Sequence, residues 1–446
     1  MLRPFASALV ALFLLAGATA VQAATRIVPV TSPGGIKAWL VEEHSIPMLA
    51  LELNFRGGAS LDPDGKEGLS NLLSGMLDEG AGPLDSEAFQ QRLQDLAISI
   101  NFSASRDSFS GSLRTLTINR DAAFDLLGLA LTQPRFDAEP VARIRDQVLN
   151  GIRSRSEDPN TIVGNTFFRL AFPGHPYGRP TNGTVESVAA VTIDDLKRFI
   201  ATRFGRDNMV IGVVGDVTPE ELGKLLDRAF ARLPEKAQIA QVAEVVPQAA
   251  GRLELVRKDI PQSVVMWGLP GIKRDDPDYF AAVLMNFVLG GSTFNSRLYS
   301  EIREKRGLAY SVYSSVVPFE RSSLLMGGVG TANERVKESL DLMRAEIRNI
   351  ADKGITDEEL ALAKTYTIGA FALSLDSNAR IAQTLLSLQI YNLGLDYLDK
   401  RSGIINAITK ADVQRIAQKL LRADAMTVVV VGDPKDVVPA AGKPPG

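Results

Sequence analysis

The chain has 446 residues, of which 45% are hydrophobic and 23% are charged, and its formal net charge at pH 7 is −3. This length allows two or more domains with full cores, and this composition excludes disordered and collagen-like classes. Because the sequence contains no cysteine, disulfides, thiolate metal sites and a cysteine nucleophile are excluded as well. The weak acidity argues against a nucleic-acid partner.

The first residues have the pattern of a secretory signal. Arg3 is basic, an apolar run extends from Ala6 to Ala18, and small residues suited to signal peptidase surround Ala23. We therefore expect a signal peptide over residues 1–23, with an uncleaved anchor as the alternative. No later segment is apolar over about eighteen consecutive residues, so no membrane span is expected after cleavage. Export of a chain without cysteine fits a bacterial periplasm.

The first predicted domain covers residues 24–232. Alternating or continuous apolar residues predict five strands, at 26–30, 38–43, 50–55, 98–104 and 108–116. Helical periodicity predicts helices at 68–79, 86–96, 120–131, 140–155 and 162–171. Strands and helices clustered in this order predict an α+β fold, with a mainly antiparallel sheet and helices packed on one face.

The second predicted domain covers residues 253–437 and follows a linker at 233–252 that has no convincing periodicity. Strands are predicted at 263–269, 308–317 and 322–329, and helices at 277–289, 296–305, 334–351, 357–370 and 379–391. The tail at 438–446 has three prolines and two glycines in nine residues. We expect this tail to be disordered.

Two distant stretches match without a gap, at residues 192–216 and 409–433. The offset is constant, because 409 − 192 and 433 − 216 both equal 217. Each copy begins with a threonine suited to cap a helix and an aspartate three residues later, and each ends in an apolar strand that stops at Gly-Asp. The repeat predicts two domains with the same fold, and the apolar strands are expected to be central in their sheets.

The segment at 289–310 reads LGGSTFNSRLYSEIREKRGLAY. It predicts a helix followed by a strand. Asn295 or Ser296 can cap the helix, and Leu298 and Ile302 can form its buried face. Gly307 can end the helix in a left-handed conformation. Arg303 then lies in the last helical turn and Tyr310 lies at the start of the strand.

This segment resembles the second-domain signature of the pitrilysin/insulinase metallopeptidases, whose zinc is held by an inverted His-x-x-Glu-His motif. In that family an arginine and a tyrosine seven residues apart reach a zinc site built elsewhere, and the matching residues here are Arg303 and Tyr310. A guanidinium and a phenol can bind a peptide carbonyl and stabilise its oxyanion during hydrolysis. Arg306 is the alternative for the arginine role. Without the resemblance, Arg303 is typical of a solvated helix end and Tyr310 of a core.

The resemblance also locates the family's zinc motif at 68–76 and its third ligand within 148–152. Asn71 and Gly75 stand at the two histidine positions, and Ser74 stands at the glutamate position. Gly151 stands at the position of the third ligand. Two imidazoles at i and i+4 can share one zinc, but asparagine is a poor zinc ligand and glycine has no side chain. The two histidines of the chain, His44 and His175, do not indicate a relocated site. We expect no metal in this chain.

The resemblance implies one half of a clam-shaped peptidase, and some members of the family are heterodimers. The leading hypothesis is a periplasmic, zinc-less subunit that contributes Arg303 and Tyr310 to peptide hydrolysis at a homologous partner. The partner would carry His-x-x-Glu-His and the zinc, and this chain would not be active alone. The alternative is a catalytically inactive member with a structural or peptide-binding role. An autonomous zinc peptidase ranks third.

Overall fold

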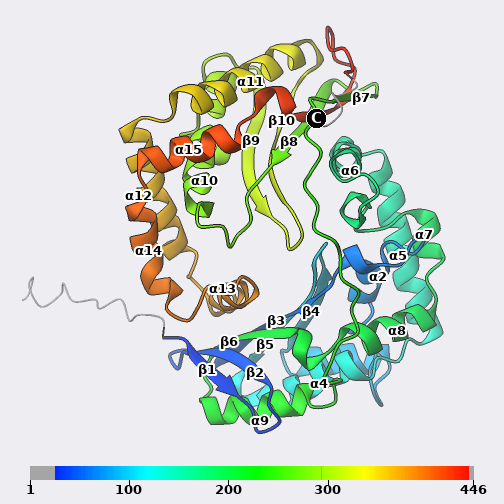
Figure 1. The fold of residues 1–446 in the computed structure, drawn as a ribbon. Helices are drawn as coiled ribbons and strands as arrows, with labels where there is room; N and C mark the ends of the chain where they lie inside the picture. The colour runs from blue at the N-terminus through cyan, green and yellow to red at the C-terminus, as the bar shows by residue number, and fades with distance from the viewer. Residues whose placement is uncertain (1–25, 293, 441–446) are drawn as a thin grey trace, which may run out of the picture.

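The structure is a computed structural model that describes residues 26–292 and 294–440 (Figure 1). The predicted signal peptide and residues 441–446 of the predicted tail lie outside the described residues. A six-stranded sheet lies in the first half of the chain and a five-stranded sheet in the second half. Helices pack against both sheets, which confirms the predicted α+β class.

The first sheet has the strand order β1-β2-β6-β3-β5-β4. All of its strand pairs are antiparallel except β2 with β6, which is parallel. Its strands are β1 (Val28–Thr31), β2 (Lys37–Glu42), β3 (Met48–Arg56), β4 (Ser99–Ala104), β5 (Ser108–Leu116) and β6 (Met209–Gly215). The apolar strand β6 lies between β2 and β3, as predicted for a central strand.

The helices of the first half share a core with one face of this sheet. Along β3, Leu49, Leu51, Leu53 and Phe55 alternate with more polar residues and are fully buried in that core. The helices are α2 (Leu69–Ser74), α3 (Ser86–Asp95), α4 (Arg120–Thr132), α5 (Ala138–Ser156), α6 (Pro159–Ala171), α7 (Val185–Ala189), α8 (Ile193–Arg203) and α9 (Pro219–Phe230). Helix α2 is shorter than the predicted helix at 68–79.

The second sheet has the strand order β7-β11-β8-β10-β9. Its strands are β7 (Leu253–Arg257), β8 (Gln262–Pro270), β9 (Ala309–Pro318), β10 (Ser323–Ala332) and β11 (Thr427–Gly432). The helices are α10 (Tyr279–Asn286), α11 (Val336–Lys353), α12 (Asp357–Leu373), α13 (Asn378–Ile390), α14 (Tyr397–Ala407) and α15 (Lys410–Leu420), with π-helical segments η5 (Phe287–Gly291) and η6 (Tyr299–Glu304).

Five strands of the first sheet and the five strands of the second have the same order. The order β2-β6-β3-β5-β4 corresponds to β7-β11-β8-β10-β9, and in both sheets the first pair named is parallel. The repeated capped helices are α8 and α15, which begin with capping boxes at Thr192 and Thr409. The sequence repeat is therefore a repeat of structure.

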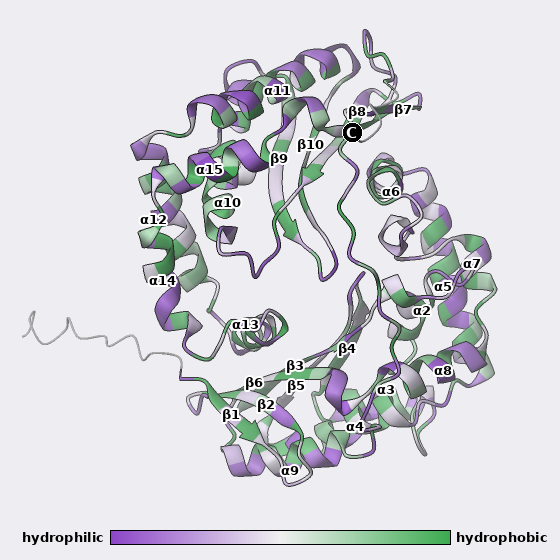
Figure 2. Ribbon diagram, in the orientation of Figure 1, coloured by the Kyte–Doolittle hydropathy of each residue, from purple (hydrophilic) through white to green (hydrophobic). Residues whose placement is uncertain are grey.

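Each half also places one helix on the sheet of the other half (Figure 1). Helix α6 packs on β8 and β11, and α13 packs on β6 and β3. A Cβ added to Gly268 on β8 would lie 2.3 Å from the Phe167 ring, and one added to Gly212 on β6 would lie 2.6 Å from the Ala382 carbonyl oxygen. In Figure 2 the α13 coil between the two sheets is largely green, as expected for a helix with a buried face.

The segment that joins the halves, 233–252, contains no helix or strand within the described chain but is tied to both halves. The amide of Gln248 donates to the Ala171 carbonyl at 2.8 Å, and the amide of Val245 donates to the Arg321 carbonyl at 3.0 Å. The start of the tail that was predicted to be disordered is ordered in the structure, because Ala440 exchanges two backbone hydrogen bonds with Leu253. A backbone bridge therefore fixes residues that proline and glycine content alone assigned to disorder.

Candidate functional site

The helix predicted at 296–305 is present, and much of it is π-helical. The Ser296 hydroxyl accepts the Tyr299 amide at 3.4 Å, so Ser296, rather than Asn295, caps this helix. Leu298 and Ile302 are fully buried, as predicted for the core-facing side. A π-helical turn rotates the following residues relative to an α-helix and is frequent at functional sites. Arg303 lies within this turn.

The helix ends at a left-handed residue, as the sequence predicted. Gly307 has φ of 59°. The Arg306 guanidinium donates to the Glu301 carbonyl oxygen at 2.8 Å and to the Glu301 carboxylate at 2.6 Å. Arg306 is thus engaged at the helix end and acts as a C-terminal cap, which leaves Arg303 as the arginine that faces Tyr310.

Tyr310 is the extra residue of a β-bulge. Thr331 of β10 pairs with Ala309 and Gly330 pairs with Ser311, so no residue of β10 opposes Tyr310. Bulges re-aim a side chain and occur beside active sites. The Tyr310 side chain is 81% exposed, which differs from a tyrosine that packs in a core.

The Arg303 guanidinium lies between two tyrosine rings. Its central carbon is 5.1 Å from the ring centre of Tyr299 and 5.1 Å from that of Tyr310. Cation–π contacts of this kind hold a guanidinium without using its N–H donors. Within residues 26–292 and 294–440, the Arg303 side chain has no hydrogen bond or ion pair. Its donors therefore remain available to a ligand.

Two polar contacts fix the elements around this pair. Arg297 forms two hydrogen bonds of 2.7 Å with the Glu359 carboxylate on α12, and this carboxylate raises the pKa of Arg297. On the other side, the Ser314 hydroxyl on β9 donates to the buried Asn286 amide oxygen at 2.7 Å. The π-helical segments are thus anchored to α12 and β9, which pre-organises Arg303 and Tyr310.

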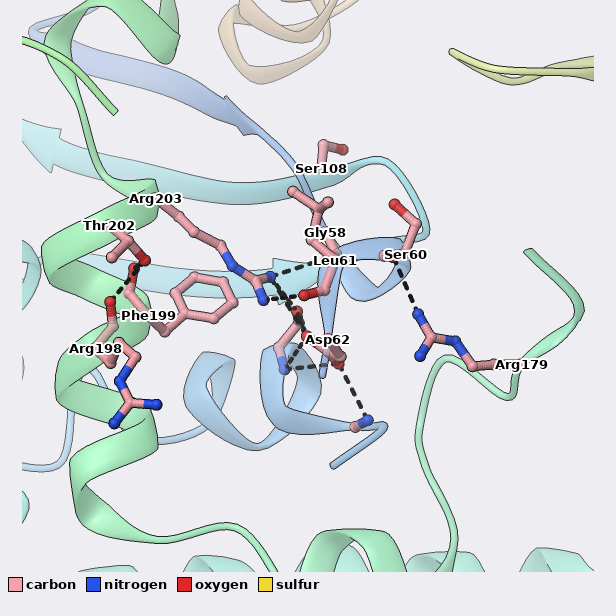
Figure 3. Close-up of polar contacts among 12 residues, drawn as sticks. Gly58, Ser60, Leu61, Asp62, Ser108, Arg179, Arg198, Phe199, Thr202 and Arg203 are labelled. Carbon is pink, nitrogen blue, oxygen red and sulfur yellow. Dashed lines mark hydrogen bonds and ion pairs between the residues drawn. The ribbon is translucent and has the colours of Figure 1, made fainter. Parts of the chain in front are cut away.

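The sequence resemblance locates the family's zinc motif at α2, and a buried ion pair holds the start of this helix (Figure 3). The Asp62 carboxylate accepts the Gly68 amide at 3.1 Å and the Ser70 hydroxyl at 2.5 Å. The Arg203 guanidinium lies 3.4 Å from the same carboxylate and donates to the Leu61 carbonyl at 2.5 Å. Burial raises the pKa of Asp62 and lowers that of Arg203. The frame of α2 is therefore well supported.

The residues at the ligand positions do not fit a zinc ion. Gly75 is already the C-cap of α2, and a Cβ there would lie 3.3 Å from a methyl carbon of Ile144. The Ser74 hydroxyl donates to the Asn71 carbonyl at 2.7 Å instead of facing a metal. On α5, a Cβ added to Gly151 would lie 3.2 Å from the Arg155 guanidinium. A cation therefore lies beside the position of the third ligand.

Neither histidine compensates for these positions. His44 Nδ1 contacts the Asp216 carboxylate at 2.7 Å, and its Nε2 lies 3.5 Å from Glu42. His175 accepts the Tyr177 amide at 3.1 Å, and its other ring nitrogen lies 3.1 Å from the Ala243 carbonyl. In the described part of the chain, no three histidine, aspartate or glutamate side chains come together as a metal site.

Comparison with known proteins identifies the fold. The family model described as insulinase (peptidase family M16) matches residues 38–185, and the one described as peptidase M16 inactive domain matches residues 190–366. A Helicobacter pylori protein named non-peptidase homolog YmxG is 30% identical over 378 residues, with 84% of this chain and 86% of that protein covered. The chain belongs to the M16 peptidase family.

Other M16 relatives agree with this assignment. An uncharacterized zinc protease of Streptomyces coelicolor is 26% identical over 406 residues, which cover 90% of this chain and 88% of that protein. The solved structure of a peptidase M16 inactive domain from Pseudomonas fluorescens matches with a TM-score of 0.86 and 31% identity, covering 94% of this chain and 99% of that one. The resemblance stated from residues 289–310 is confirmed.

Several features of this M16 chain carry no clear sequence signal. The two π-helical segments and the bulge at Tyr310 depend on backbone hydrogen bonds that local propensity does not specify. Gly290 gives a partial sequence signal for the close approach of the first π-helical segment to β9, because a Cβ there would lie 2.5 Å from the Ser314 hydroxyl. None of the helices in the described residues is both long and apolar enough to cross a membrane.

Proposed function

We propose that this chain is the zinc-less subunit of a two-chain M16 peptidase and supplies Arg303 and Tyr310 to a partner's zinc site. The observation that supports the proposal is the geometry of this pair. A guanidinium with no ion pair in the described residues lies 5.1 Å from the ring of an exposed, bulged tyrosine. Both groups can donate hydrogen bonds to a peptide carbonyl and to the oxyanion that forms from it.

The absence of fitting ligands at Asn71, Gly75 and Gly151 means that activation of water would have to come from another chain. The partner we propose is a homologous M16 protein with an intact His-x-x-Glu-His helix, and the substrate is a peptide. Relatives named both as a non-peptidase homolog and as zinc proteases support a family that contains both kinds of chain. We propose a periplasmic location, which N-terminal sequencing and cell fractionation test.

The experiment is to purify the chain with its zinc-bearing partner and to measure hydrolysis of a quenched fluorescent peptide. Arg303→Ala and Tyr310→Phe are each expected to lower kcat/KM by about 10²- to 10³-fold, the typical effect of removing an oxyanion donor. Arg306→Ala is the matched control, because Arg306 caps the helix and is expected to leave the rate nearly unchanged. Wild-type turnover by the Arg303→Ala, Tyr310→Phe double variant would refute the proposal.

The second candidate is a peptide-binding M16 protein without hydrolytic function. It is favoured by the loss of all ligand positions together with an intact fold. It predicts that no purified complex hydrolyses peptides, although the chain still binds them. The same preparation therefore distinguishes the two candidates.

A further inference from the structure

A cavity of about 820 Å³ opens between the two halves, away from Arg303. It is formed by the end of β3, the turn between β4 and β5, α6, the turn between β9 and β10 and the end of α13. Tyr310 and Pro318 lie eight residues apart on β9, and only Pro318 lines the cavity. At a rise of ~3.3 Å per residue, the cavity is about 26 Å from Tyr310.

Arginines line this cavity without carboxylate partners. Arg56, Arg106 and Arg274 all contribute to its wall, and none of them forms an ion pair within the described residues. Arg203 and Arg297, by contrast, each meet an aspartate or a glutamate. Guanidinium groups that lack a carboxylate are suited to bind one from a ligand.

Arg106 and Arg56 come from adjacent strand ends. Arg56 pairs with Ser108 in the β3–β5 ladder, and Arg106 lies two residues before Ser108. The Arg106 guanidinium stacks on the Phe168 ring at 3.8 Å, and burial lowers its pKa to about 10, so it stays charged at neutral pH. One of its nitrogens is buried without a hydrogen bond. A buried cation with unused donors gains from a bound anion.

The acidic residues of the cavity do not neutralise these arginines by direct pairing. The Asp107 carboxylate accepts the Tyr177 hydroxyl and, at 2.9 Å, the Glu320 amide. Glu320 itself pairs with Arg321 at 3.2 Å. Asp275 is exposed at the rim. Lys273, the remaining cation, pairs with Glu244.

The wall also includes apolar and aromatic side chains, among them Phe319, Ile390 and Tyr391, beside polar ones such as Asn54 and Thr181. A peptide C-terminus carries a carboxylate and a side chain on the same carbon, so it can meet guanidinium and aromatic groups within one cavity. An internal aspartate or glutamate offers only the carboxylate. The match therefore favours a chain end with an apolar last residue.

We propose that this cavity binds the C-terminus of a peptide, with Arg56 and Arg106 binding the carboxylate and Phe319 and Tyr391 contacting the last side chain. The proposal deepens the peptide-binding role proposed above by naming which part of the peptide is held. Arg274, across the cavity on the second half, donates to the Tyr397 hydroxyl at 2.6 Å and adds positive charge.

The test is fluorescence anisotropy with the full mature chain and a fluorescein-labelled hexapeptide of alanine and serine that ends in phenylalanine. The peptide with a free C-terminus is expected to bind about tenfold more tightly than its C-terminal amide, the effect of a charged hydrogen bond. An amidated peptide with one internal aspartate is expected to bind like the plain amide. Arg56→Gln and Arg106→Gln are each expected to remove the preference.

Arg348→Gln is the matched control, because Arg348, which lies on α11, pairs with Asp424 and does not line the cavity. Arg303→Ala is also expected to keep the preference, so failure here and failure of the proposed zinc-site role are distinguishable. Because Arg106 packs on Phe168, its variant could unfold, and the exposed Arg56 then provides the decisive variant. Equal binding of the free acid and its amide overturns the proposal, and so does a preference for the acid that survives Arg56→Gln. The proposal is also overturned if the amidated peptide with an internal aspartate binds as tightly as the free acid.

Discussion

The two halves of this M16 chain have the same strand order but differ in the helices that follow the equivalent strands β3 and β8. After β3, a short helix is fixed by the buried pair of Asp62 and Arg203 and presents no metal ligands. After β8, two π-helical segments and a bulge present Arg303 and Tyr310. The comparison teaches that two halves with the same strand order can present different side chains from the helices beside their sheets.

The largest effect is expected from Arg203, whose position in the second copy is occupied by Leu420, because 420 − 203 equals 217. Arg203→Leu makes the first half like the second but leaves Asp62 buried without its cation. Breaking a buried pair on one side costs about 3–5 kcal/mol of unfolding free energy. Urea denaturation measures this loss.

The second variant of this pair separates charge from packing. Asp62→Asn combined with Arg203→Leu removes both charges and is expected to recover part of the lost stability. If Arg203→Leu alone is as stable as the wild type, the ion pair does not support α2 and this part of the comparison fails.

The exchanged helices provide the next test. Gly212→Ala places a methyl group against the backbone of α13, and Gly268→Ala places one against the Phe167 ring of α6. We expect each to destabilise the fold by about 1–3 kcal/mol, with the larger loss at Gly212, because a backbone oxygen cannot rotate away. Thermal unfolding measures both losses.

The control is a strand glycine at which an added Cβ would meet no helix. A Cβ at Gly330 on β10 would lie 3.5 Å from the Ser311 hydroxyl, which is ordinary contact. Gly330→Ala is therefore expected to have little effect. Similar losses in all three variants would mean that strand glycines matter here for reasons other than the crossing helices.

Glu52 marks a further difference between the sheets. It pairs with Gly212 on β6, and the corresponding residue on β8 is Met266, which pairs with Val429. Burial raises the pKa of Glu52 from 4.5 to about 7, and Arg114 opposes this shift. Because the folded chain holds this proton more tightly than the unfolded chain, Glu52 lowers stability as pH rises from about 4.5 to 7.

Glu52→Gln is expected to remove this pH dependence and to stabilise the chain at pH 7.5 by about 2–3 kcal/mol relative to its effect at pH 4.5. Urea denaturation at the two pH values measures the difference. If the unfolding free energy changes equally between the two pH values in the wild type and in Glu52→Gln, another group is responsible for the pH dependence.

The fold was predictable where the signal was local. Strands such as 108–116 were predicted by alternation, and the repeat at an offset of 217 predicted two similar sheets. The motif at 289–310 located Arg303 and Tyr310 on a helix and a strand. The strands depend on nearby residues, so periodicity is sufficient to find them. Arg303 and Tyr310 were singled out by the resemblance of residues 289–310 to a family signature, not by composition or periodicity.

The exchange of α6 and α13 between the halves was not predictable, because an apolar helix face does not identify the sheet it will cover. The length of α2 was overestimated for a related reason. Met76 and Leu77 continue the apolar pattern, but Gly75 ends the helix. The bulge at Tyr310 arises because Thr331 and Gly330, some twenty residues later, pair with Ala309 and Ser311.

The smallest expected effect compares the two capping aspartates. Asp195 accepts the Thr192 amide at 2.8 Å and also pairs with Lys66 at 2.5 Å, in the segment before α2. Asp412 accepts the Thr409 amide at 2.9 Å but has no such partner from another element in the described chain. Burial opposes ionisation of Asp195, yet the contacts with Lys66 and Thr192 lower its pKa to about 2. The Thr409 contacts lower the pKa of Asp412 to about 2 as well.

Both carboxylates thus stabilise the folded chain above pH 3.8, and this contribution is lost as pH falls toward 2. Asp195→Asn is expected to cost about 1 kcal/mol at pH 7, and Asp412→Asn less, because only Asp195 joins two elements of the fold. Urea denaturation should show the variants and the wild type converging as pH approaches 2. If Asp412→Asn costs as much as Asp195→Asn, the Lys66 contact contributes nothing, and the caps are equivalent in both halves.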